Sequence, residues 1–173
     1  MRSTILVLLT ALLISPAALA QTRKRSSPKK STSSAAATAQ REAQVKTQGA
    51  TRVADQIKFL TKFIYLLGGA TSNLTAVEES VKRKEAGPAT AQQNEAAKAQ
   101  IKSSITGFRE ALDKLEIDFR GTPELAPYYI KLAGVASGAA TAEQQAGNNQ
   151  FDAAGRSLLG VVNRLTDVLL IMR

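Results

Sequence analysis

The sequence predicts an all-α protein whose residues 41–173 form an antiparallel up-down four-helix bundle. Large apolar residues recur at alternating steps of three and four, which places them on one face of a helix. The connections between these stretches are short, about 3–5 residues, so consecutive helices should be antiparallel neighbours. No segment has the two-residue alternation of a half-buried strand.

Residues 1–20 have the features of a secretory signal peptide. Arg2 supplies positive charge, and residues 5–14 (ILVLLTALLI) are almost entirely apolar. Pro16 interrupts this stretch, and Ala18-Leu19-Ala20 has the small-x-small pattern of a cleavage site. We therefore expect cleavage after Ala20 and export to the periplasm or out of the cell.

A membrane anchor formed by the same segment is the alternative. The apolar run is well short of the roughly 20 residues that span a bilayer. However, Arg23, Lys24 and Arg25 follow the cleavage site directly, and positive charge on that side opposes translocation.

Residues 21–40 (QTRKRSSPKKSTSSAAATAQ) contain no large apolar side chain, so they are expected to be disordered. Much of the net charge of +9 is concentrated in this basic segment. It is either a solvated tether or a tail that binds anionic lipid or an anionic envelope polymer. Export would put nucleic acid out of reach. The cations of the tail are Arg23, Lys24, Arg25, Lys29 and Lys30.

The first helix of the bundle should end near Gly87-Pro88, because proline cannot continue the hydrogen-bond ladder. Phe59 and Phe63 widen its apolar stripe. Gly68-Gly69 lies inside the helix, and we expect a continuous or kinked helix because the stripe keeps its phase; a restart at the capping box that begins with Thr75 is the alternative. The stripe consists of Val53, Ile57, Leu60, Ile64, Leu67, Leu74 and Val81.

The second helix should be capped by Thr90, with Gln93 completing a capping box, and should end at Gly121. Its stripe consists of Ile101, Ile105, Phe108, Leu112, Leu115 and Phe119. Because the first two helices look longer than the last two, part of their hairpin is expected to project or to pair elsewhere. Exposed apolar residues there would indicate self-association.

The third helix is expected over about 123–145, after the start signal Thr122-Pro123-Glu124. Its apolar residues are Leu125, Tyr128, Tyr129, Leu132 and Val135. Gly134 and Gly138 indicate a weak end of this helix, and close approach of a neighbouring backbone is the alternative. Gly147-Asn148-Asn149 should form a turn. The fourth helix carries Phe151, Leu158, Val162, Leu165, Leu169 and Met172.

The chain has no cysteine and no histidine. Disulfides, thiol catalysis and the Glu-x-x-His sites of di-metal bundles are therefore excluded. We expect no enzyme activity, no cofactor and no metal. An acidic cluster on the second helix could suggest a calcium site, but Arg109 and Lys114 are interleaved with it, which favours a solvated face. The cluster consists of Glu110, Asp113, Glu116 and Asp118.

Three tyrosines are the remaining candidates for contact with a ligand: Tyr65, Tyr128 and Tyr129. Tyrosine in a bundle usually packs its ring and directs its hydroxyl to the rim. A small pocket or a partner contact between the first and third helices is the other interpretation.

The sequence thus predicts a non-catalytic exported bundle that acts through contact with an unknown protein partner or with a second copy of itself. One alternative is an envelope-associated module bound through the basic tail. Another is a sensor-type bundle that binds a small ligand.

Overall fold

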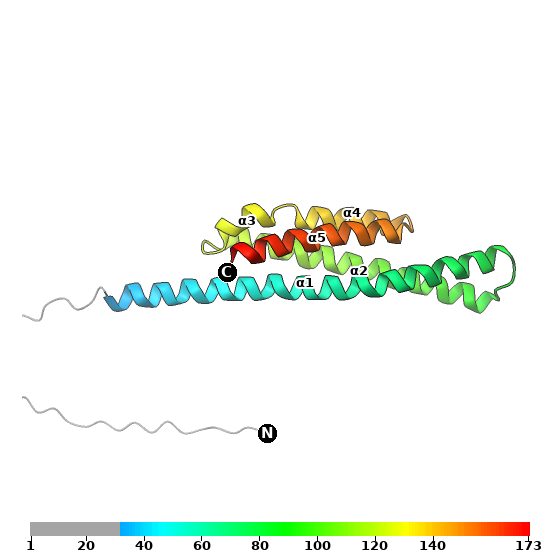
Figure 1. Cartoon of the computed structure of the whole chain (residues 1–173), viewed down its shortest axis with the longest axis horizontal. Coiled ribbons are helices and arrows are strands. Elements are labelled where there is room, and N and C mark those ends of the chain that lie inside the picture. Colours follow the sequence, from blue (N-terminus) through cyan, green and yellow to red (C-terminus); the bar gives the residue numbers. More distant parts are fainter. Residues whose placement is uncertain (1–31) are drawn as a thin grey trace, which may run out of the picture.

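A computed structural model describes residues 32–173, with side-chain surroundings from residue 35 onward. All of its regular elements are helices, and this part of the chain contains no strand, which confirms the all-α prediction. The helices are α1 (Thr32–Lys82), α2 (Pro88–Gly121), α3 (Ala126–Leu132), α4 (Val135–Gly147) and α5 (Phe151–Ile171) (Figure 1).

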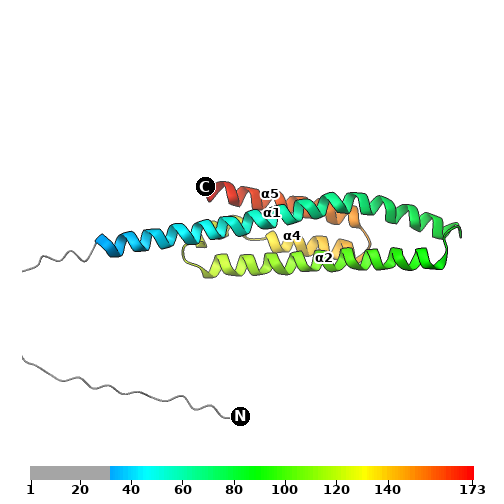
Figure 2. The ribbon, with the colours of Figure 1, turned by 90° about the horizontal axis from the view of Figure 1, so that it is seen from below.

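The four long helices lie side by side, and consecutive ones run in opposite directions (Figures 1 and 2). Helix α1 packs against α2 and α5, while α4 packs against α2 and α5. Each long helix therefore has two neighbours among the other three. Helices α1 and α2 extend past the turn between α4 and α5, so the end of their hairpin projects from the molecule (Figure 1).

The predicted apolar stripes meet in one core. Leu60, Ile105, Leu132 and Leu158 are fully buried, so each of the predicted stripes contributes. On α4 the buried residues after Val135 are all alanines, whose small side chains let α4 lie close to α2 and α5. The stripe of α1 is buried only as far as Leu74, because Val81 on the projecting hairpin is exposed.

Helix α1 differs from the prediction at its beginning. Residues 32–40, which lie in the segment expected to be disordered, are helical. Alanine has the highest helix propensity of any residue, and four of these nine positions are alanine. Residues 35–44 are all exposed, so the helix forms there without burying an apolar face. Residues 1–31, with the predicted signal peptide and the five tail cations, lie outside the described residues.

Helix α1 is continuous through Gly68-Gly69, as predicted. The alternative of a restart at Thr75 is wrong, since the Thr75 hydroxyl donates to the Thr71 carbonyl within the helix at 3.0 Å. The predicted cap at Thr90 is also wrong. Helix α2 begins at Pro88 with Gly87 as its N-cap, because proline is well suited to the first helical position.

The predicted third helix is broken into α3 and α4. Gly134 has φ of +88°, a left-handed conformation that interrupts the helix. The break leaves free N–H groups at the start of α4, and the Glu116 carboxylate accepts one of them from Ala136 at 2.8 Å. The helix does not weaken at Gly138, because a Cβ there would lie 2.9 Å from Val161 on α5. That glycine instead allows close packing.

Gly49 gives a test of packing at the other end of α1. A Cβ at Gly49 would lie 2.7 Å from Leu125 Cδ2 and 3.1 Å from Met172 Cε. Replacing Gly49 with alanine should therefore lower the free energy of unfolding by about 1 kcal/mol, because overpacking outweighs the gain in helix propensity. Gly107→Ala on α2, where a Cβ meets nothing within 4 Å, should raise it by a similar amount. Thermal unfolding followed by circular dichroism measures both, and equal effects would contradict this packing.

Candidate functional site

A polar cleft lies where the α1–α2 hairpin projects past the turn between α4 and α5. The inward stripe of α1 becomes polar here, with Thr71 and Glu78 at positions that would otherwise carry apolar side chains. The cleft has a volume of about 370 Å³. It is lined by Thr71, Leu74, Thr75, Glu78, Asn149, Gln150, Phe151, Asp152, Ala153 and Arg156.

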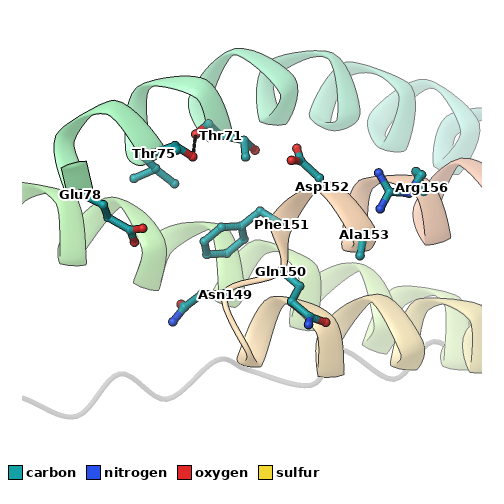
Figure 3. Close-up of a pocket in the computed structure, with 10 residues that line it drawn as sticks. Thr71, Thr75, Glu78, Asn149, Gln150, Phe151, Asp152, Ala153 and Arg156 are labelled. Atoms are coloured by element: carbon teal, nitrogen blue, oxygen red, sulfur yellow. Dashed lines mark hydrogen bonds between the residues drawn. The ribbon is translucent and has the colours of Figure 1, made fainter.

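Three elements contribute the polar groups of the cleft. Figure 3 shows Glu78 on α1, Asn149 and Gln150 on the turn before α5, and Asp152 and Arg156 on the first turns of α5. The turn is tight because Asn149 has φ of +61°, a conformation that asparagine tolerates better than most residues. The cleft therefore offers carboxylate, amide and guanidinium groups to a small polar molecule.

An ion-paired lysine connects α1 to α2 in the projecting hairpin. The side chain of Lys98 is only 8% exposed and forms ion pairs with Glu78 and with Glu95, the latter at 2.8 Å. The hydrogen bond from Lys98 holds the pKa of Glu78 below its ordinary value. The bonds to Glu78 and Glu95 hold the pKa of Lys98 above its ordinary value. Glu78 and Lys98 are therefore both charged near neutral pH.

The cleft has polar groups that can bind a small molecule. The charge of Glu78 is offset by Lys98, and Asp152 and Arg156 carry opposite charges. Among the described residues, Asp152 and Arg156 form no ion pair, so both can hydrogen-bond to a ligand. The hydroxyl of Thr71 donates to the Leu67 carbonyl at 2.8 Å and has no base beside it. The geometry fits recognition of a neutral or zwitterionic molecule.

Each acidic residue of the predicted cluster on α2 has a partner, and Glu110 and Asp113 share Arg109. Arg109 binds Asp113 at 2.6 Å and Glu143 of α4 at 2.7 Å, which ties α2 to α4. Glu116 accepts a hydrogen bond at the start of α4, as described above, and Asp118 pairs with Arg52 of α1. In the part of the chain that the structure describes, no group of three carboxylates is placed to hold a metal ion.

The structure does not bring the three tyrosines together. Tyr128 and Tyr129 are partly buried against the core, and the amine of Lys46 lies 5.9 Å from the ring centre of Tyr128. Tyr65 lies 19 residues beyond Lys46 on α1, which corresponds to about 28 Å along a helix. Its side chain is 82% exposed. Tyr65 is therefore separated from the other two tyrosines, but Tyr128 lines a cavity of about 460 Å³ between α1 and the start of the predicted third helix, together with Lys46 and Glu124.

The sequence contains a signal for the polar hairpin that its apolar pattern alone did not reveal. Asn94 and Lys98 precede Ile101 and Ile105 in the same alternation of four and three. Both are buried, as their place in the stripe requires. Polar residues in phase with an apolar stripe, opposite Glu78 in the stripe of α1, indicate a polar seam between two helices.

Comparison with known proteins identifies no relative of this chain. No protein-family model matches it, and no curated protein or solved structure does so either. Of the helices that the structure describes, none is both long and apolar enough to cross a membrane.

The Glu78–Lys98 pair predicts a dependence of stability on pH. The pKa of Glu78 is lowered from its ordinary value of 4.5. The contribution of its charge to the free energy of unfolding is therefore complete above pH 4.5 and is lost as the pH falls through the lowered pKa. The contribution of Lys98 is present below 10.5 and is lost as pH rises through its raised pKa. The ionic seam should therefore be strongest between these limits.

Glu78→Gln should lower the melting temperature at pH 7, where it removes a carboxylate from Lys98. At a pH well below the lowered pKa of Glu78 the wild-type carboxyl is itself neutral, so the difference between the two proteins should vanish. Glu42→Gln on the exposed start of α1 is the control and should have no effect at either pH. A deficit of the same size at both pH values would show that the ion pair is not the cause.

Proposed function

We propose that this chain is an exported, non-catalytic, antiparallel helical-bundle protein that acts through contact with another protein or with a second copy of itself. The observation that carries the proposal is a group of large apolar side chains exposed on the outer side of α1. Phe59 is 54% exposed, Tyr65 82% and Leu66 57%.

Clustering distinguishes these side chains from ordinary surface residues. Single exposed apolar side chains are normal on a soluble protein, but contiguous ones mark a site of interaction. Phe59 and Leu66 are two helical turns apart on one side of α1, and Phe63 lies between them, packed against Phe108 of α2 with a centroid distance of 5.1 Å. Phe63 and Phe108 are partly buried, so they connect this exposed side of α1 to the core.

Export is the part of the proposal that rests on the sequence alone. Arg2, the apolar stretch 5–14 and Ala18-Leu19-Ala20 support a signal peptide cleaved after Ala20. A membrane anchor formed by the same residues stays the alternative. Edman sequencing of the chain recovered from cells that make it would give Gln21 first if cleavage occurs, and Met1 or Arg2 if it does not.

Binding of a small polar molecule in the cleft is the second candidate function. The unpaired Asp152 and Arg156, together with the side-chain amides of Asn149 and Gln150, favour it. Binding of the basic tail to an anionic envelope surface is a third, and it rests on the five tail cations of the sequence.

Chemical crosslinking in the intact envelope tests the leading proposal. The chain should be recovered in a defined crosslinked species, either with a second copy or with another protein. The double variant Phe59→Ser and Leu66→Ser should lose that species, because it removes the apolar side chains from the contact. Leu170→Ser is the matched control, since Leu170 on α5 is also 57% exposed but lies away from this surface. Uncrosslinked chain alone, or equal crosslinking of all variants, would refute a contact through α1.

A further inference from the structure

We infer that the contact is a two-fold symmetric, antiparallel pairing of α1 with α1 of a second copy, crossing at Gly68-Gly69. The inference rests on the proposed function and specifies its partner and surface. The surface, called here the outer face of α1, consists of Lys58, Phe59, Lys62, Tyr65, Leu66, Gly69, Ser72, Asn73, Ala76, Val77 and Glu79.

Neither Gly68 nor Gly69 is required for packing among the residues that the structure describes. Glycine lowers the stability of a helix interior relative to alanine, so a pair of them needs a compensating reason. A Cβ at Gly68 or at Gly69 would meet nothing within 4 Å. At Gly49 of the same helix a Cβ would lie 2.7 Å from Leu125, so that glycine is explained by internal contact. Close approach of a backbone from outside the chain would explain Gly69, which lies on the outer face. Gly68 lies about 100° further round the helix and lines a cavity against α5 together with Gly155.

The residues around the glycines are arranged as a two-fold contact requires. Tyr65 and Leu66 lie one turn before Gly69, and the small or polar Ser72 and Asn73 lie one turn after it; all four are exposed. In an antiparallel pair centred on Gly68-Gly69, residues at equal distances before and after the centre come to the same height. Tyr65 of one copy therefore comes to the height of Ser72 of the other, and Leu66 lies within about one residue of that height.

The charges on this face fit an antiparallel second copy. Lys58 precedes Gly68 by ten residues, and Glu79 follows Gly69 by ten. Each is thus about 15 Å from the crossing point, and the 100° rotation per residue places both on the same edge of the face. Lys58 of one copy would lie beside Glu79 of the other, twice by symmetry. Neither forms an ion pair among the described residues.

At the opposite edge of the outer face, apolar side chains of the two copies would meet. Phe59 precedes Gly68 by nine residues, and Val77 follows Gly69 by eight, so they come to nearly the same height in the antiparallel pair. Phe59 is 54% exposed and Val77 is partly buried. A parallel pair would instead place Lys58 beside Lys58 and Lys62 beside Lys62. The charge pattern therefore selects the antiparallel direction.

A charge exchange tests the pairing and its direction. Sedimentation of the purified chain, in the form that cells produce, measures the dimer dissociation constant. Lys58→Glu or Glu79→Lys alone should raise that constant about tenfold, because each variant creates two repulsive pairs. The double exchange should restore it to within about threefold of the wild-type value. Lys58 and Glu79 are too far apart on one helix to interact, so restoration requires two chains. Lys114→Glu on α2 is the control and should have no effect.

A cysteine at the crossing point gives an independent test, because the chain contains no cysteine of its own. Gly69→Cys should form an intermolecular disulfide in mild oxidant, since the two positions would face each other across the two-fold axis. Gly107→Cys, at an equally open glycine of α2, is the matched control and should stay largely monomeric.

The outcomes separate this inference from the function on which it rests. A dimer that is indifferent to both charge changes, or a double exchange that fails to restore association, would overturn the α1 pairing and leave self-association standing. A strict monomer at all concentrations would overturn the pairing itself. A monomeric chain that nevertheless binds vesicles of anionic lipid through Phe59 and Leu66 would also overturn it, in favour of a lipid surface.

Discussion

Burial of the apolar stripe of α1 against α2 and α5 is the contact on which the rest of this structure depends. Helix α1 is the longest element, with 51 residues, and it packs against both neighbours along one side. Val53, Leu60 and Leu67 supply the buried side chains of that stripe. Because one stripe of a single helix organises the molecule, the opposite side of α1 has no neighbouring helix among the described residues. The N-terminal end of α1 extends past the other helices, while its C-terminal end extends together with α2 past α4 and α5 (Figure 2).

The stripe changes character where its neighbours end, and the functional surfaces follow from that change. Beyond Leu74 the inward positions of the hairpin are Glu78, Asn94 and Lys98, so the two helices are joined by an ionic seam in place of a core. A polar seam can face water without cost to solubility, and it forms one wall of the cleft. The outer side of α1 has the reverse composition, with apolar side chains left in water at Phe59 and Leu66.

The apolar periodicity predicted the all-α fold and most of the large buried side chains, because each stripe is a local property of one helix. It missed Val161 and Val168 of α5 and the buried alanines of α4 and α5. The break at Gly134 was missed, since a positive φ is set by packing of α3 and α4 onto their neighbours. The helical start of α1 was missed because alanine propensity acts without any apolar face. The separation of Tyr65 from Tyr128 was also missed, because the apolar stripe of one helix does not determine its register relative to another helix.

Amide hydrogen exchange along α1 tests most directly whether the buried stripe organises the molecule. Amides at residues 53–67, which lie under α2 and α5, should exchange only with global unfolding. Amides at residues 35–44 should exchange orders of magnitude faster, because that part of the helix is exposed on all sides. Uniform protection along all of α1, or weaker protection at 53–67 than at 35–44, would contradict the account.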